Sequence, residues 1–338
     1  MSSNQSLYLD APGTPLRLAS SPIPQPGPDE LIIETKALSI NPIDVAQSAT
    51  GFFIKSYPRV LGQDVSGIVH SIGTNNTSSS TFSQGDRVTA HAWSMLTGQN
   101  EDAAWQKYVR VKAKNTAKLP ENVSFAEGVV LPLVLNTAAA GLYQTLQLPL
   151  PEVGKKREGE GVLVVYGGSS AVGLSVTQLA TASGVRVVAI ASEKNHALVK
   201  EVGAKEVFDQ KEGDEMVEKV VKAIAATKEK FIGVFDAIAV EATYKHDLAI
   251  LEKLGGGAFI STHQLPESLP ENVKGKFIFG LGEFSFPLWE EYIPQALESG
   301  ELKIRPEPLV VGKGLESIEK ALEVYKKGVS GKKVVVEL

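Results

Sequence analysis

The stretch VLVVYGGSSAVG, residues 162–173, decides the fold of this chain. An apolar run leads into a Gly-Gly pair, and Gly168, Ser170 and Gly173 then stand at the spacing of G-x-G-x-x-G, with serine in the middle place. In such a turn the first glycine permits the tight bend, the middle residue lets the backbone approach a pyrophosphate, and the last lets helix and strand pack closely. Because serine is small, the stretch predicts a strand, a dinucleotide-binding turn and a helix from about Ala171.

Phosphate groups are the expected ligands of this turn. The hydroxyl of Ser170 and the first amides of the helix can donate hydrogen bonds to a pyrophosphate, aided by the positive end of the helix dipole. The alternative is a purely structural connection between strand and helix. The residues predicted to bind the cofactor here are Gly167, Gly168, Ser169, Ser170, Ala171, Val172 and Gly173.

The next strand ends in the sequence IASEKNH, residues 190–196, which bears on the choice of dinucleotide. An NAD site has Asp or Glu about 20 residues after the glycines, bound to the ribose 2′-hydroxyl. Here Ser192 and Lys194 suit a 2′-phosphate, since a charge-assisted hydrogen bond contributes about 1.5–3 kcal/mol. The segment therefore predicts NADP(H), provided that the side chain of Glu193 points away. The alternative is a solvated junction in which Ser192 only caps a helix.

Strands and helices alternate after about Phe125, which is typical of a parallel sheet covered on both faces. The candidate strands are 161–166, 185–191, 206–209, 233–239, 257–261 and 276–280. The first 120 residues instead carry short β-rich runs among many prolines and glycines, at 30–40, 65–73 and 105–111, and a polar segment, 73–86, predicted to be a surface loop. After a helix predicted at 315–328, the final KKVVVEL is expected to return to the N-terminal sheet.

Composition narrows the classes of function. The 338-residue chain is 43% hydrophobic, has a net charge of −5 and contains no cysteine. The negative charge argues against binding a nucleic-acid backbone, and the lack of cysteine excludes disulfides, thiolate catalysis and sulfur-bound zinc. We find no run near the roughly 18–20 apolar residues of a membrane-spanning helix and no secretory signal at the start. A cytoplasmic protein without membrane or nucleic-acid partners is expected.

With a strand-rich region, a central glycine-rich turn and a returning strand, the whole chain resembles the medium-chain dehydrogenase/reductase superfamily. Its motifs look most like the zinc-free fungal branch, which holds trans-acting enoyl reductases of polyketide pathways and quinone-reductase-like proteins. The resemblance implies a mostly β, GroES-like catalytic domain, 1–127 with 286–338, and a Rossmann-type α/β domain, 128–285. The motifs are ALSINPIDVAQ, YPRVLGQDVSGIVHSIG, FSQGDRV, LPLVLNTAAAGLYQ, VYGGSSAVG, ASEKNHALVKEVGAKEVFD and GKKVVVEL.

The positions that match zinc ligands argue for metal-free chemistry. Zinc-dependent alcohol dehydrogenases of this superfamily use a Cys, a His-Glu pair and a later Cys, where this chain has Asn41, Gln63 with Asp64, and about Leu133. Asparagine, glutamine and leucine are not zinc ligands of the usual nitrogen or sulfur kind. The histidines are interpreted as structural or exposed, and none pair at i, i+4: His70, His91, His196, His246 and His263.

Without a metal, hydride transfer needs an acceptor that its own substituents activate, such as an enoyl thioester, an enone or a quinone. NADPH would deliver hydride to the β-carbon of a conjugated C=C bond. Hydrogen-bond donors would stabilise the charge that develops on the carbonyl oxygen, and a side chain or water would protonate the α-carbon. The alternatives are a quinone oxidoreductase and a non-catalytic NADPH-binding scaffold. A carrier-bound substrate, and a monomer or homodimer, are compatible with the resemblance.

The resemblance also implies catalytic positions along a cleft. Asn41 is expected to hydrogen-bond the substrate carbonyl or a water, or else to shape the turn before the next proline. Asp44 is expected to orient backbone near the nicotinamide, and Tyr57 is a candidate proton donor, with packing as its alternative. Thr137, expected at the start of a helix, and Asn136 are predicted to contact the cofactor.

Overall fold

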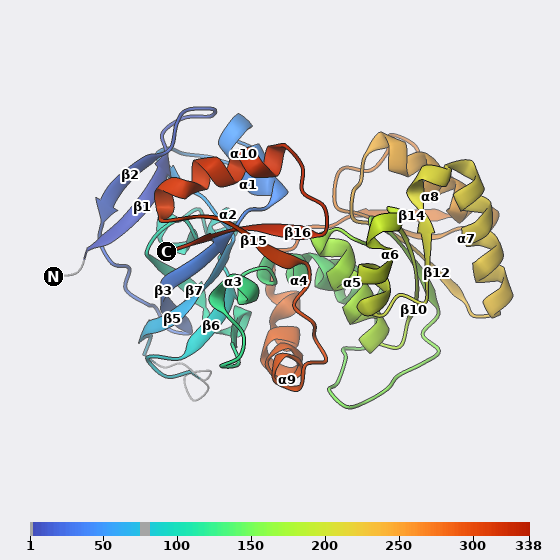
Figure 1. The fold of residues 1–338 in the computed structure, drawn as a ribbon, viewed down its shortest axis with the longest axis horizontal. Helices are drawn as coiled ribbons and strands as arrows, with labels where there is room; N and C mark the ends of the chain where they lie inside the picture. Colours follow the sequence, from blue (N-terminus) through green and yellow to red (C-terminus); the bar gives the residue numbers. More distant parts are fainter. Residues whose placement is uncertain (1–2, 75–81) are drawn as a thin grey trace. The chain divides into compact units, whose positions relative to one another are not determined.

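The chain is described from a computed structural model over residues 3–74 and 82–338 (Figure 1). It divides into unit 1, Met1–Leu133 with Trp289–Leu338, and unit 2, Val134–Leu288. These boundaries fall a few residues after the predicted ones, because helix α4 (Pro132–Ala139) begins in unit 1 and continues into unit 2. Residues 75–81 of the predicted surface loop lie outside the described residues.

Unit 2 is built on a six-stranded parallel sheet of order β11-β10-β9-β12-β13-β14. Its strands are β9 Val162–Tyr166, β10 Arg186–Ala191, β11 Glu206–Asp209, β12 Phe231–Asp236, β13 Gly257–Ser261 and β14 Val273–Phe277. Its helices are α5 Ala171–Ala182, α6 His196–Glu201, α7 Asp214–Thr227 and α8 Glu241–Lys253. The predicted Rossmann-type α/β architecture is confirmed.

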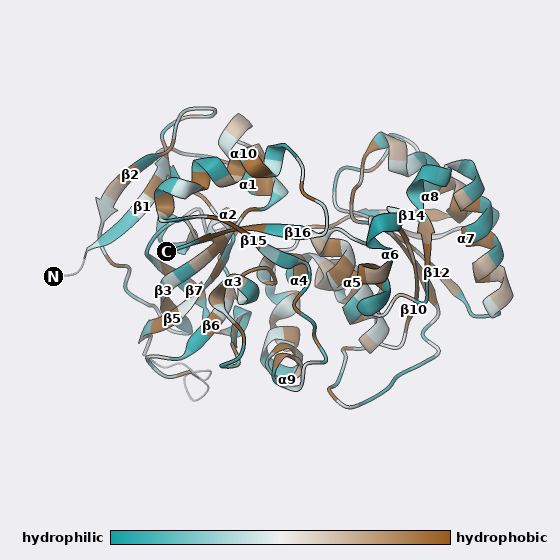
Figure 2. Ribbon diagram, in the orientation of Figure 1, coloured by the Kyte–Doolittle hydropathy of each residue, from teal (hydrophilic) through white to brown (hydrophobic). Residues whose placement is uncertain are grey.

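Both faces of this sheet are covered, as the apolar strands require. On one face Val164 and Phe259 pack with α7 and α8 residues such as Met216 and Ile250. On the other, the π-helical segment η3 (Ala140–Thr145) lies so close that a Cβ on Gly141 would meet the ring of Phe235 at 2.3 Å. Figure 2 shows the matching pattern, with hydrophobic colour along the strands and hydrophilic turns on α7 and α8.

Two strand predictions were wrong at their ends. Strand β12 stops at Asp236, not at Ala239, because the Asp236 carboxylate accepts hydrogen bonds from the backbone N–H of Ile238 (2.8 Å) and of Ala239 (2.9 Å) and turns the chain. Strand β14 ends at Phe277, three residues before the predicted Gly280. It is an edge strand with exposed Lys274 and Lys276, so its apolar run marks the segment that follows the strand rather than the strand itself.

Unit 1 is mostly β, which confirms the expected GroES-like class. A three-stranded sheet of order β2-β1-β4 lies beside a seven-stranded one of order β15-β16-β3-β5-β6-β8, in which β7 also pairs with β3. The strands are β1 Asn4–Leu9, β2 Arg17–Ser21, β3 Glu30–Ser39, β4 Arg59–Val60, β5 Asp64–Ile72, β6 Arg87–His91, β7 Tyr108–Lys112, β8 Thr116–Lys118, β15 Glu307–Lys313 and β16 Lys332–Glu337. The helices are α1 Pro42–Thr50, α2 Ser94–Thr97, α3 Phe125–Gly128, α9 Ile293–Ser299 and α10 Ile318–Lys326.

The C-terminal strand returns to the N-terminal sheet, as predicted. Strand β16 pairs antiparallel with β3, with Val335 opposite Ser39 and Glu337 opposite Ala37. The valines of β16 are fully buried and join the same core as β3 and β5. The first and last segments of the chain therefore share one hydrophobic core.

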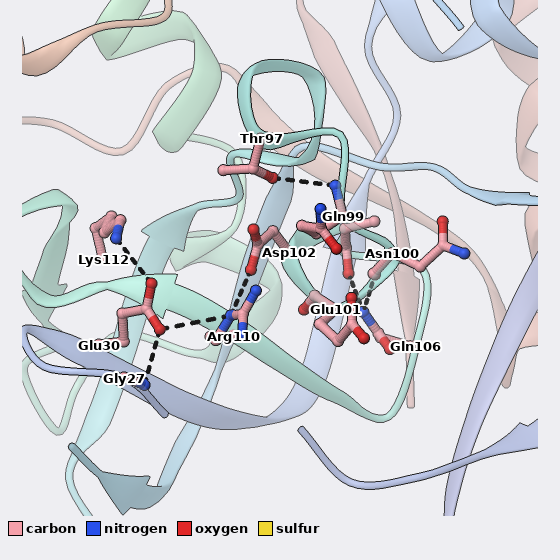
Figure 3. Close-up of polar contacts among 11 residues, drawn as sticks. Gly27, Glu30, Thr97, Gln99, Asn100, Glu101, Asp102, Gln106, Arg110 and Lys112 are labelled. Carbon is pink, nitrogen blue, oxygen red and sulfur yellow. Dashed lines mark hydrogen bonds and ion pairs between the residues drawn. The ribbon is translucent and has the colours of Figure 1, made fainter. Parts of the chain in front are cut away.

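Polar side chains hold the segment from α2 to β7 in unit 1 (Figure 3). The buried Gln106 carboxamide donates to the carbonyl oxygens of Asn100 (2.8 Å) and Ala103 (2.7 Å). Arg110 donates to the Asp102 carboxylate at 2.7 Å and lies 3.5 Å from Glu30. Side-chain hydrogen bonds and ion pairs thus order this segment.

One helical stretch is as long and apolar as a membrane-spanning helix, although no such run is expected from the sequence. Phe125–Thr145, which joins α3, α4 and η3, is long and apolar enough to cross a membrane by length and composition, with a mean hydropathy of 1.5. However, 83% of that window is buried inside the protein. Core helices of globular proteins pass the same test, and we interpret this stretch as part of the core.

Asp236 at the end of β12 and Asp247 on α8 form a pair of buried aspartates. Asp236 accepts a further hydrogen bond from the Thr243 hydroxyl at 2.5 Å, whereas neither oxygen of the fully buried Asp247 on α8 has a donor among the described residues. Burial, with the neighbouring Asp236 charge, raises the pKa of Asp247 well above its ordinary value. A protonated Asp247 can donate to Asp236, so the folded protein holds this proton more tightly than the unfolded chain does.

The aspartate pair predicts a pH-dependent effect of Asp247→Asn on stability. Because the folded-state pKa is raised, the wild-type contribution is present below about pH 4 and is lost as the pH rises. We expect the variant to be more stable than the wild type by about 1–3 kcal/mol above neutral pH, with the difference shrinking toward pH 4. Urea unfolding across this pH range measures it, with Glu252→Gln on the exposed side of α8 as the control. A difference that does not change with pH would contradict the proton-sharing pair.

Candidate cofactor site and active site

Strand β9 leads directly into the predicted turn. Gly167 has φ of 73°, in the left-handed region that glycine tolerates, and the Gly168 N–H donates to Ile190 of β10 at 2.9 Å. Ser170 caps helix α5, since its Oγ accepts from the Gly173 N–H at 3.0 Å. The Ser170 hydroxyl keeps its hydrogen for donation to a ligand.

Close packing explains why Gly173 is a glycine. A Cβ there would lie 2.3 Å from the Gly167 carbonyl oxygen and 2.9 Å from the Gly168 Cα. Next to it, Ser169, Ser170, Ala171 and Val172 are half-buried rather than covered. Partly accessible amides and hydroxyls at the N-terminus of a 12-residue helix fit the pyrophosphate of a dinucleotide.

The segment after β10 lies next to this turn. The Asn195 amide donates to the Ser169 hydroxyl at 3.1 Å, which ties the two loops together. Ser192 makes no side-chain cap to the 3-10 turn η4 (Glu193–Asn195); instead its Oγ accepts from Gln210 at 3.2 Å. Glu193 and Lys194 are both exposed, and within residues 3–74 and 82–338 neither forms an ion pair. Lys194 therefore remains able to pair with an anionic ligand.

Asn136 and Thr137 lie in the second turn of α4, so the expectation that Thr137 stands at the start of a helix was wrong. The cause is the buried run before it, which begins the helix at Pro132. Asn136 is fully buried and Thr137 is 9% exposed. The segment after β14 lies against Thr137, since a Cβ on Gly280 would meet the Thr137 Oγ1 at 2.7 Å.

In unit 1, Asn41 belongs to a buried polar cluster. Its Nδ2 donates to the Asp64 carboxylate at 2.7 Å, and its Oδ1 accepts from the Lys333 ammonium. Asp64 also accepts from the Ser39 hydroxyl at 2.5 Å and from the Leu133 N–H at 2.7 Å. Asn41, Asp64 and Ser39 are 0% exposed. Both ends of the Asn41 carboxamide thus have protein partners, and its contact with substrate stays a prediction.

Asp44 and Tyr57 lie at the two ends of helix α1. The Asp44 carboxylate accepts from the Asn41 backbone N–H at 2.8 Å and so orients the backbone there, while its place near the nicotinamide stays a prediction. Burial raises the pKa of Asp44 to about 7, and the charge of Asp64 adds to this effect. The Tyr57 hydroxyl lies against Gly51, the C-cap of α1, where an added Cβ would approach it to 2.4 Å.

The residues at the matching metal positions do not fit a metal ion. A positive charge is already there, because the Lys333 ammonium bonds Asn41 and lies 3.6 Å from the Asp64 carboxylate. His91 pairs opposite Asp64 in the sheet, and burial lowers the pKa of His91 to about 4. In the described part of the chain, no group of three or more His, Cys, Asp or Glu could hold a metal ion.

Sequence reasoning missed two members of this cluster, Lys333 and Ser39. Lys333 is 292 residues away from Asn41, and spacing carries no information over that distance. Its signal in the sequence is weak: a second lysine directly before the three valines of β16. A charged side chain that faces a buried sheet needs a buried partner of opposite charge, and Asp64 could have been proposed on that ground.

Comparisons with known proteins agree with both units. Residues 27–121 match the family model described as alcohol dehydrogenase GroES-like domain, and residues 171–289 match the one described as zinc-binding dehydrogenase. Dehydrogenase orsE of Emericella nidulans is 40% identical over 100% of both chains. Trans-enoyl reductase himH of Aspergillus japonicus is 34% identical over 91% of this chain and 90% of its own. A solved mycobacterial protein complexed with NADPH has a TM-score of 0.70 at 25% identity, covering 99% of this chain and 100% of its own.

The glycine-rich turn predicts that Gly173→Ala weakens NADPH binding. The new Cβ would collide with the Gly167 carbonyl and displace the amides that are predicted to face the phosphates. With about 1–3 kcal/mol for overpacking, we expect the dissociation constant to rise roughly 5- to 150-fold. Fluorescence titration with NADPH measures it. The control, Ala182→Ser, adds one atom at the other end of α5 and leaves affinity unchanged; equal affinity in both variants would contradict the site.

Proposed function

Because this chain belongs to the medium-chain dehydrogenase/reductase superfamily, in its fungal enoyl-reductase-like branch, we propose that it is an NADPH-dependent, metal-free oxidoreductase that reduces an activated C=C bond. The buried contact of Lys333 with Asn41 and Asp64 carries this proposal. With an ammonium group at the metal-matching positions, the acceptor must be activated by its own substituents. Enoyl thioesters and enones meet that requirement.

NADPH rather than NADH is supported by the end of β10. No carboxylate stands at Ser192, while Lys194 is exposed beside the turn and the exposed Glu193 can point into solvent. The mycobacterial protein of similar structure, which binds NADPH, agrees with this choice. When bound, the cofactor would supply a hydride to the β-carbon of the acceptor. Ser192 and Lys194 would hold its 2′-phosphate, and residues 167–173 its pyrophosphate.

The remaining roles are proposed from the resemblance and from the neighbours of each side chain. We assign Asn136 and Thr137 to contacts with the nicotinamide end of the cofactor. Tyr57 or a water would deliver the proton to the α-carbon. Asp44 would hold the backbone at Asn41. Asn41, whose carboxamide is fixed by Asp64 and Lys333, would hydrogen-bond the substrate carbonyl or a water. The proposed substrate is a small molecule, either free or bound to a carrier as a thioester. The protein is proposed to act in the cytoplasm as a monomer or homodimer.

An acceptor panel tests the proposed activity. With verified folded protein, we expect NADPH-dependent loss of absorbance with enoyl thioesters or enones, without added metal and unaffected by chelators. A preference for quinones of more than about a hundredfold in kcat/KM, or roughly 2.7 kcal/mol, would instead identify a quinone oxidoreductase. Tight NADPH binding without turnover of any acceptor would indicate a non-catalytic scaffold.

Replacing Lys194 tests the assignment of the 2′-phosphate. Lys194→Glu removes a charge-assisted hydrogen bond, so the dissociation constant for NADPH is expected to rise about 10- to 100-fold, with little change for NADH, which lacks that phosphate. Calorimetry with both cofactors measures the difference. The control, Lys200→Glu on the exposed side of α6, makes the same change in net charge. Equal losses in the two variants would show a general charge effect and no specific contact.

A further inference from the structure

We propose that Lys333 is a positioning residue for the reaction. Its ammonium fixes Asn41 and Asp64, and through Asp64 it fixes the first turn of helix α4. Asn136 and Thr137 lie in the next turn of the same helix. The role in catalysis rests on the proposed function. The contact with the start of α4 does not, because Asp64 and Leu133 both belong to unit 1. Neither the superfamily matches nor the glycine-rich turn assigns a role to this lysine.

Lys333 is the inward-facing member of a lysine pair. Neighbouring residues of a strand point to opposite faces of a sheet. Lys332 is exposed and forms an ion pair with Glu307 at the surface, whereas Lys333 is 5% exposed and bonds the Asn41 carboxamide. Burying an ammonium group is unfavourable unless it is paired. The buried partners, Asn41 and Asp64, therefore define where this side chain must lie.

Asp64 connects the lysine to helix α4. One carboxylate oxygen, Oδ2, accepts from Ser39 and Asn41 and lies 3.6 Å from the Lys333 Nζ. The other, Oδ1, accepts from the Leu133 N–H at 2.7 Å. The first amides of a helix have no partner within the helix and attract negative charge. Asp64 thus serves as the anionic cap of α4, although it lies 69 residues before Leu133.

Lys333 balances the negative charges that are buried around the cluster. Asp44 and Asp64 are both fully buried and close enough for the charge of Asp64 to raise the pKa of Asp44. His91, opposite Asp64, has a pKa lowered by burial to about 4 and is neutral near pH 7. Burial lowers the pKa of Lys333, and the two carboxylates oppose that change. Lys333 is therefore the cation that balances these carboxylates among the residues that the structure describes.

The geometry of α4 transmits the effect toward the cofactor. Thr137 lies four residues after Leu133, one helical turn along the same face. If Lys333 is removed, Asp64 loses its balancing charge and no longer holds the Leu133 amide in the same place. A shift of the first turn carries Asn136 and Thr137 with it. Misplacement of a catalytic group by about 1 Å can cost on the order of a hundredfold in rate.

The primary test compares Lys333→Met with Lys332→Met, which removes the exposed lysine of the same strand. We expect Lys333→Met to lower kcat at least tenfold and to speed hydrogen exchange in peptides that cover residues 130–140. NADPH affinity should fall by a smaller factor than kcat, since the predicted pyrophosphate turn at 167–173 is unchanged and only the contacts assigned to Asn136 and Thr137 shift. Lys332→Met should leave all three quantities unchanged. A folded Lys333→Met with the kcat and exchange of Lys332→Met would overturn the proposal.

A double variant separates positioning from general stability. In Lys333→Met with Asp64→Asn, no charge remains to be balanced between these two positions. The new amide can still accept from the Leu133 N–H, and it can donate to the Asn41 Oδ1, which Lys333 no longer occupies, once the Asn41 carboxamide turns over. We expect it to recover protection at residues 130–140 and most of the kcat lost by Lys333→Met. If Lys333→Met does not fold, the double variant decides: an unprotected start of α4 in a folded double variant contradicts the proposal.

Hydrogen exchange keeps the two proposals distinguishable. If the wild-type chain reduces no acceptor, the proposed function fails, but the exchange comparison still reports whether Lys333 holds α4. If the wild type is active and exchange at residues 130–140 is the same in Lys333→Met and wild type, the proposed function stands and the role of Lys333 is refuted. Each combination of results therefore identifies which proposal is wrong.

Discussion

A buried ammonium–carboxylate contact organises unit 1, and the candidate chemistry depends on it. Lys333 from the last strand meets Asp64 from β5 and Asn41 from the start of α1. Removing one member of such a group leaves a buried charge without a partner, and this lowers the stability of the fold far more than replacing the whole pair does. The contact joins the C-terminal segment to the N-terminal sheet and to the first turn of α4. It also places a positive charge at the positions that match metal ligands in the resemblance.

The two units use the same physical device, an anion at the N-terminus of a helix, for different ends. In unit 1 the anion belongs to the protein, since Asp64 meets the Leu133 amide at the start of α4. In unit 2 the start of α5 is half-accessible, and Ser170 satisfies only the Gly173 amide. Under the proposed function, the remaining amides and hydroxyls bind phosphate groups. An anion that belongs to the protein orders a helix end in the folded state, whereas an accessible helix end is available to a ligand.

The prediction of unit 2 from sequence succeeded where local chemistry dominates. Long apolar strands followed by a glycine-rich turn specify β9 and α5, because both the strand periodicity and the close approach at Gly173 are local properties. The ends of β12 and β14 were misjudged. Asp236 turns the chain through bonds to its own following amides, and apolar residues continue beyond both strands. Hydrophobicity alone does not mark where a ladder stops.

The sequence by itself determined the strand, glycine-rich turn and helix at residues 162–182, because their periodicity and close approach are local properties. The superfamily architecture and the return of the last strand followed from the order of motifs along the chain. Through the resemblance, the sequence also predicted that the positions of metal ligands hold Asn41, Gln63 with Asp64, and about Leu133. Only the tertiary structure decided what Asn41 and Asp64 do. Their partner, Lys333, comes from the far end of the chain, and the burial that makes its charge consequential exists only after β16 has paired with β3. Electrostatic balance in a core is a property of what is packed together, and sequence order does not encode it.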